Sequence, residues 1–204
     1  VTLMVDSVAH LDLIDAVMPP NERGVVRICI DIDAALRAGP VHIGALRSPL
    51  HTVDEVRAVV RHLRQREGFR LVGLMAYEGQ IAGTTDTSPA IAAMKALSVR
   101  ELARRRANIV AAVEEELRVA GLPALEFVNG GGTGSIETTS AEAAITEIGA
   151  GSGIIGPALF DHYRQFQPTP AEWFVVPVVR RPQLVRDQLL VEPLAAAYAA
   201  FAMG

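Results

Sequence analysis

The chain has 204 residues, of which 50% are hydrophobic and 21% charged, so it can bury a sizeable core and lacks the composition of a disordered protein. A net charge of -4 and a single lysine, Lys95, argue against the basic surface that nucleic-acid binding requires. The one cysteine, Cys29, excludes an internal disulfide, and no apolar run is long enough to span a membrane, so we expect a cytoplasmic protein with neither a nucleic-acid nor a membrane partner.

Short apolar, β-branched runs alternate with longer amphipathic stretches, a pattern typical of βα units around a mostly parallel sheet. The predicted strands are, in chain order, Thr2–Val5, Val26–Ile32, Leu71–Ala76, Ala124–Val128, Thr146–Ile148 with its continuation, and Glu172–Val179. The predicted helices are Val53–Arg66, which follows a Thr52/Glu55 capping box, Pro89–Gly121, which is long enough to be two helices, and Ser140–Ala144.

These connections leave two architectures, a closed barrel or an open doubly wound sheet, because parallel strands are joined by right-handed crossovers with a helix outside. Five or six strands are too few for an eight-stranded barrel. Val1 leads directly into a strand, and the tail from Gln183 turns alanine-rich. We therefore expect an α/β fold, an incomplete (β/α)8 barrel of parallel strands with outer helices that lacks its first strands and the C-terminal β-domain.

Polar residues gather directly after the predicted strands, where folds of this kind keep their sites. The segment Asp31–Gly39 ends a strand with two carboxylates and Arg37. Arg37 could hold a carboxylate or phenolate oxygen, or it could form an ion pair with Asp31 or Asp33. Tyr77 follows the next strand, where it could stack on a flat ring, although half-buried packing is the commoner role of such a tyrosine.

Two glycine-rich loops follow the next two strands. Asn129–Ser135, here called the first glycine loop, offers backbone N–H groups and the hydroxyls of Thr133 and Ser135, which together could hold a phosphate or form a merely flexible turn. Gly149–Gly156, the second glycine loop, formally matches the dinucleotide-binding fingerprint, but Pro157 follows at once. Two loops of this kind after successive strands better suit one phosphate gripped from both sides.

Other chemistries lack their sequence signatures. The five histidines show no H-x-x-x-H or H-E-x-x-H spacing, so we expect no metal site within this chain. No G-x-S-x-G elbow marks a serine hydrolase. Cys29 lies in an apolar run and is expected to be a buried structural thiol.

Taken in order, these segments resemble the barrel domain of the pyridoxal phosphate (PLP)-dependent fold-type III enzymes, which include alanine racemases, D-threonine aldolases and D-serine dehydratases. The resemblance covers about residues 1–182. Besides the two glycine loops, it rests on Asp31–Gly39, on Gly73–Gly79 with the tyrosine of the aldolase-like members, and on Gly156–Tyr163.

The resemblance implies that PLP binds at the mouth of the barrel. It would place Arg37 near the phenolic oxygen of the cofactor and Tyr77 against its pyridine ring, and these two are the candidate catalytic residues. The two glycine loops would supply the remaining cofactor contacts, from Asn129, Gly131, Gly132, Thr133, Gly151 and Ser152.

The chain departs from the family in two respects. The Schiff-base lysine of the family lies on the first barrel strand, which has no counterpart here, and Lys95 falls in the predicted long helix as a surface residue. The divalent metal that some full-length relatives carry is bound in a C-terminal β-domain, which would begin after Arg181. The implied organisation is a partial PLP barrel over residues 1–170, then the start of the C-terminal domain and an atypical alanine-rich tail over residues 171–204.

The resemblance implies a PLP-dependent amino-acid lyase of the D-threonine aldolase, D-serine dehydratase or amino-acid deaminase type, inactive as this chain alone because that lysine is absent. A racemase is the second choice, since the arginine opposite the pyridine nitrogen has no counterpart near Gly149. The expected partners are a small amino-acid substrate and a second subunit in a homodimer. Two alternatives remain: a non-catalytic PLP- or phosphate-binding protein, and a nucleotide-binding module in which Gly151–Gly156 opens a helix.

Overall fold

The central element of the fold is a sheet of five parallel strands. The computed structural model describes residues 1–173, 175 and 177. In the sheet the strands stand side by side in the order in which they occur along the chain: β1 (Thr2–Val5), β2 (Val26–Asp31), β5 (Phe69–Ala76), β6 (Phe127–Gly130) and β7 (Glu147–Ile148). This sequential order has no reversal of the kind found in a doubly wound sheet, and it corresponds to consecutive βα units of a barrel.

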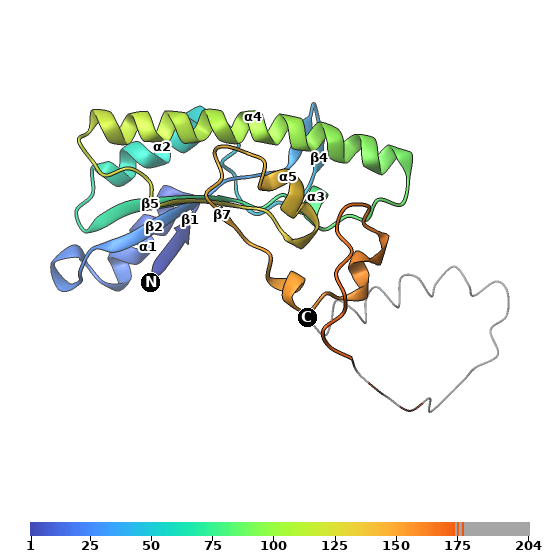
Figure 1. The fold of residues 1–204 in the computed structure, drawn as a ribbon. Coiled ribbons are helices and arrows are strands. Elements are labelled where there is room, and N and C mark those ends of the chain that lie inside the picture. The colour runs from blue at the N-terminus through green and yellow to red at the C-terminus, as the bar shows by residue number, and fades with distance from the viewer. Residues whose placement is uncertain (174, 176, 178–204) are drawn as a thin grey trace. The chain divides into compact units, whose positions relative to one another are not determined.

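The longer helices connect the strands and bury one face of the sheet. They are α1 (Val8–Val17), α2 (Val53–Arg64) and α4 (Pro89–Val119), and Figure 1 shows α2 and α4 together on one side of the sheet. Leu11 of α1, Val60 of α2 and Ile109 of α4 belong to a single buried cluster with Ile28 and Ile30 of β2. The expected α/β class, with parallel strands and helices outside, is therefore confirmed.

Shorter elements occupy the loops. An antiparallel hairpin of β3 (Leu36–Ala38) and β4 (Val41–Ile43) follows β2. Single-turn helices α3 (Gly79–Ala82) and α5 (Ile136–Thr139) follow β5 and β6, and short 3-10 helices lie at Pro20–Glu22, Thr133–Ser135, Gly151–Ile154 and Ala158–His162.

The strand register assigns each side chain to one of two faces. Ile30 pairs with Leu74, and Leu74 with Val128, so these three share the helix-covered face. Because successive residues of a strand point to opposite sides, Cys29 belongs to the other face. A register shift between Ile28 and Cys29 aligns Cys29 with Gly73 and Phe127 on that face.

Most predicted strands are confirmed. Thr2–Val5 has the predicted bounds, and β2, β5 and β7 differ from their predictions by one or two residues. The α4 segment forms one helix of 31 residues, not two. In the described part of the chain, no helix is both long and apolar enough to cross a membrane.

Two predictions of local structure were wrong, and two elements were not predicted. The strand predicted at Ala124–Val128 begins only at Phe127, and the helix predicted at Ser140–Ala144 lies earlier, because Ser140 caps the end of α5 through its N–H bond to the Ile136 carbonyl. Helix α1 and the β3–β4 hairpin were missed altogether. The hairpin turn depends on Gly39, whose φ of +57° favours glycine.

The C-terminal predictions fall almost entirely on residues that the structure does not describe. Residues Val1–Glu172 pack as one compact unit. Residues 174, 176, 178 and 179 of the predicted strand Glu172–Val179 lie outside the described residues, as does the alanine-rich tail, so the division between residues 170 and 171 stays a prediction.

Candidate functional site

The two glycine loops meet at the carboxyl edge of the sheet. The first glycine loop leaves β6 and the second leaves β7, the neighbouring strand. Their hydroxyl-bearing residues face each other, with Thr133 Oγ1 at 2.7 Å from Ser152 Oγ. Residues 19 positions apart in the sequence therefore present two hydroxyls at one point, which is the geometry expected for two loops that hold one oxyanion.

Tyr77 lies against the first glycine loop. A Cβ atom added to Gly132 would lie 3.0 Å from Tyr77 Cε2 and 2.7 Å from Ala82 Cβ, so a glycine is needed where the loop passes over the ring. The guanidinium carbon of Arg47 lies 5.7 Å from the centre of the same ring. Tyr77 is thus half-buried at the end of β5, on the side where the glycine loops meet.

The first glycine loop is tied to the protein by a buried carboxylate that the sequence analysis did not single out. Glu78, directly after Tyr77, is only 1% exposed and accepts hydrogen bonds from the Gly131 N–H at 3.1 Å and the Ser135 hydroxyl at 3.0 Å. The Thr139 hydroxyl donates to the same carboxylate.

The counter-charge of Glu78 comes from helix α4. Arg106 is 2% exposed, and its Nη2 lies 2.8 Å from Glu78 Oε2 and 3.0 Å from the Ala76 carbonyl oxygen. Its Nη1 lies 2.7 Å from Glu142, and burial raises the pKa of that carboxyl although Arg106 opposes the shift. An arginine within the buried stripe of a predicted helix is the signal that could have revealed this pair.

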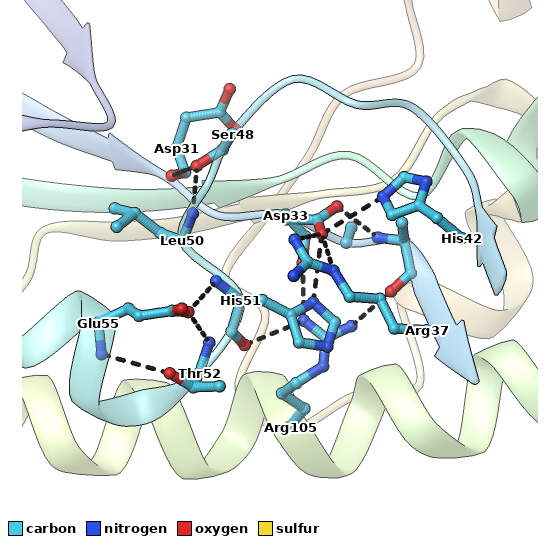
Figure 2. Close-up of polar contacts among 12 residues, drawn as sticks. Asp31, Asp33, Arg37, His42, Ser48, Leu50, His51, Thr52, Glu55 and Arg105 are labelled. Carbon is cyan, nitrogen blue, oxygen red and sulfur yellow. Dashed lines mark hydrogen bonds and ion pairs between the residues drawn. The ribbon is translucent and has the colours of Figure 1, made fainter. Parts of the chain in front are cut away.

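Arg37 is engaged elsewhere, in a group of side chains around Asp33 (Figure 2). Its Nε and Nη2 atoms lie 2.9 Å and 2.6 Å from Asp33 Oδ2, and His51 Nδ1 lies 3.2 Å from the same oxygen. Arg105 of α4 donates to the main-chain oxygens of Asp33 and Ala35. Of the two roles considered for Arg37, the ion pair with Asp33 is the one that the structure contains, and no contact among the described residues joins Arg37 to Tyr77.

The protonation states in this Asp33 group follow from its surroundings. Burial opposes ionisation of Asp33, but the Ala35 N–H and the Arg37 guanidinium outweigh it and lower the pKa of the carboxyl. Burial also lowers the pKa of His51, and the nearby charges of Arg105 and Arg37 add to that effect. The group therefore holds an ionised Asp33 next to an imidazole that resists protonation.

The remaining predicted contact residues have different surroundings. Asn129 points to the sheet face away from the helices, where its amide donates to Glu147 at 2.7 Å. Gly131 has a φ of +86°, and its N–H is taken by Glu78. Gly151 is exposed, and an added Cβ there would meet nothing within 4 Å.

Lys95 is not the solvated surface residue that the sequence analysis expected. Its side chain is only 12% exposed, and Nζ lies 2.8 Å from Asp86 and 2.8 Å from the Thr84 carbonyl oxygen. The amine also lies over the ring of Tyr163, 4.7 Å from its centre. The loop before α4 and the Tyr163 segment together cover this lysine.

The structure also bears on the other candidate chemistries. Burial raises the pKa of the Cys29 thiol to about 12, as expected of a structural cysteine. Gly151–Ile154 forms only a short 3-10 helix before Pro157, so the helix that a nucleotide-binding fingerprint requires is not formed. In the part of the chain that the structure describes, no group of three His, Cys, Asp or Glu side chains is placed to hold a metal ion.

Solved structures of several enzymes share this fold, and three of them match more than four-fifths of this chain as follows. D-threonine aldolase from Filomicrobium marinum matches 84% of this chain and 40% of its own, at 22% identity and a TM-score of 0.54. Alanine racemase from E. faecalis matches 83% and 39%, at 13% identity and a TM-score of 0.56. Alanine racemase from Bacillus anthracis with bound L-Ala-P matches 83% and 38%, at 13% identity and a TM-score of 0.52.

The likeness confirms the expected resemblance at the level of the fold. The chain spans about two-fifths of the length of these enzymes. No protein-family model matches the sequence, and no curated protein matches it either. The fold is therefore that of part of the barrel found in an aldolase and in racemases.

Proposed function

We propose that this chain forms the phosphate-binding side of a PLP-dependent amino-acid lyase of the D-threonine aldolase, D-serine dehydratase or deaminase type. On its own the chain is inactive, because it has no lysine in a position to carry the cofactor. A small amino acid is the substrate, and a homodimer remains the expected assembly.

The observation that carries this proposal is the contact between Thr133 and Ser152. Two hydroxyls 2.7 Å apart, on loops that leave adjacent parallel strands, form a site for one oxyanion at the edge where such sheets bind ligands. Gly132 and Gly151 let the backbone approach a ligand without a side chain in the way. The donor set is neutral and suits a phosphate ester bound by hydrogen bonds.

The residues present fit the phosphate and the ring of PLP. Tyr77 lies against the loop that carries Thr133, in a place where its ring could stack on a flat cofactor. Arg37 would have to leave Asp33, or share it, to reach a phenolic oxygen. When bound, PLP supplies an electron sink for bonds at the α-carbon of an amino acid.

Lys95 does not fit the role of the cofactor lysine. Its amine is held by Asp86 and by the Thr84 carbonyl, so it is occupied by these contacts rather than free to act as a nucleophile. In this proposal, the lysine that carries the cofactor lies on a polypeptide segment other than residues 1–204. The chain's own residues bind the phosphate, orient the ring and close one side of the site.

The first test is phosphate-dependent binding. PLP and inorganic phosphate should each raise the unfolding temperature, and pyridoxal, which lacks the phosphate, should not. At a ligand concentration of about 100 times Kd the stabilisation should be about 2.7 kcal/mol. The double variant Thr133→Val with Ser152→Ala should lose this effect, whereas Ser140→Ala, which removes an exposed hydroxyl bonded, among the described residues, only to the Glu137 carbonyl, should keep it.

The alternative, a non-catalytic PLP- or phosphate-binding protein, shares the binding result and differs in chemistry. Supplying the missing barrel segment in trans, with its lysine, should produce turnover of a D-amino acid only if the lyase proposal holds. Borohydride reduction of the chain with PLP should leave Lys95 unmodified, as judged by mass spectrometry. The assignment would be refuted if pyridoxal raised the unfolding temperature as much as PLP does, or if borohydride reduction left a stoichiometric adduct on Lys95.

A further inference from the structure

The carboxylate of Glu78 contacts both ends of the turn Gly131–Ser135 within the first glycine loop. Gly131 begins the turn with a positive φ of +86°, and its N–H points to Glu78 Oε2. Ser135 ends the turn and donates its hydroxyl to Glu78 Oε1 at 3.0 Å. One buried side chain therefore sets the separation and direction of the two ends of the loop.

The same carboxylate reaches the middle of the loop through Ser135. The Ser135 oxygen accepts the N–H of Gly132 at 3.1 Å while its hydroxyl donates to Glu78. The Gly132 position is the one that passes over Tyr77. The backbone that leads to Thr133 is thus fixed by a relay that starts at Glu78.

Helix α4 fixes the carboxylate in turn. Arg106 binds Glu78 and the Ala76 carbonyl with the same nitrogen, so the guanidinium anchors the residue at the end of β5. A buried carboxylate without such a partner would be strongly disfavoured. The Nη1 atom of Arg106 binds Glu142, whose side chain makes no hydrogen bond to the glycine loops in the described part of the chain.

We propose that Glu78, held by Arg106, is the positioning residue of the phosphate site: it shapes the first glycine loop and directs the Thr133 hydroxyl to Ser152. This inference rests on the proposed function. The positioning role also affects ligand specificity, because the hydrogen-bond donors of Gly131, Ser135 and Thr139 are already bonded to Glu78. The hydroxyls of Thr133 and Ser152 are then the ones left to select the oxyanion.

The test compares Glu78→Gln with the matched control Glu142→Gln. Both variants neutralise a carboxylate bound to Arg106, but only Glu78 contacts the loop. A second variant, Ser135→Ala, breaks the relay to Gly132 and leaves the ion pair intact, so it decides the question if Glu78→Gln does not fold. The two measurements are hydrogen exchange of the amides of residues 131–135 and the affinity for inorganic phosphate.

Glu78→Gln and Ser135→Ala should each accelerate exchange in residues 131–135, and weaken phosphate binding, by about tenfold or more. Glu142→Gln should change either quantity by less than about threefold, because among the described residues the Glu142 side chain bonds only to Arg106 and makes no hydrogen bond to residues 131–135. Equal effects of Glu78→Gln and Glu142→Gln, or unchanged exchange in Ser135→Ala, would overturn the positioning role. A wild-type chain that fails to bind phosphate but shows the expected exchange pattern would refute the proposed function alone.

Discussion

Gly73 and Phe127 form a cross-strand pair whose energetics can be predicted in detail. The two residues are register partners on β5 and β6, and the ring of Phe127 covers the glycine. A Cβ atom added to Gly73 would lie 2.4 Å from the ring carbons Cε2 and Cζ. Because carbon atoms in contact are normally about 3.5–4.0 Å apart, Gly73→Ala would overlap the ring by roughly 1 Å.

The expected effect of Gly73→Ala reverses sign when the ring is removed. In the wild-type chain the substitution should lower the free energy of unfolding by about 1–3 kcal/mol through overpacking. In a Phe127→Ala background the ring is gone, and alanine should be better than glycine within a strand by about 0.5–1 kcal/mol. The coupling energy between the two positions should therefore be about 1.5–4 kcal/mol.

Urea unfolding of the wild type, both single variants and the double variant measures this coupling. Gly73→Ala should lower the urea midpoint in the wild-type chain and raise it in the Phe127→Ala background. The slope of the free energy of unfolding against urea concentration should not change. If Gly73→Ala were equally destabilising with and without the ring, the stacking of Phe127 on Gly73 would not be the cause.

Three further predictions concern protonation and helix capping. Because the Cys29 thiol has a pKa raised to about 12, its thiolate at pH 8 should be about a thousandfold scarcer than that of a thiol with the ordinary value of 9.0, and iodoacetamide should label it rapidly only in urea. Equal labelling with and without urea would contradict this. Thr52→Ala should cost about 1 kcal/mol in urea unfolding, because it removes the oxygen that accepts the Glu55 N–H at the start of α2; no loss would mean that the cap is not formed in solution. Burial, and then the charge of Arg105, lowers the pKa of His51 below 6.5, so the unfolded chain takes up this proton first and the free energy of unfolding should fall as the pH drops below 6.5. His51→Asn should remove that part of the acid sensitivity, and an identical pH profile in the variant would count against it.

The parallel sheet could be predicted because its strands are continuous apolar runs. Val26–Asp31 and Phe69–Ala76 are buried or nearly so along most of their length, which is typical of strands covered by crossover helices. Helix α1 escaped prediction although Ser7 occupies its N-cap position, because its apolar residues show no clear one-sided pattern and only Leu11 is buried. The hairpin escaped because three-residue strands carry almost no periodicity.

Some features of the candidate site could be predicted from the sequence, and others could not. The hydroxyl pair Thr133 and Ser152 could be predicted from loop chemistry alone, since parallel strands deliver their following loops to one edge. The role of Glu78 could not be predicted from the sequence, because it depends on Arg106, which is 28 residues away. The partner of Arg37 remained open between two aspartates until the hairpin geometry brought it to Asp33.

Helix α4 contacts two loops at the carboxyl edge of the sheet, the loop after β2 and the loop after β5. At 31 residues it is about 46 Å long, well beyond the length of any strand it covers. Adjacent residues on it point about 100° apart, so Arg105 reaches the loop after β2 while Arg106 reaches Glu78 in the loop after β5. Inserting a single residue into α4 before Arg105 would rotate both guanidiniums by about 100° around the helix axis. The loops after β2 and β5 would then both lose their contact with α4.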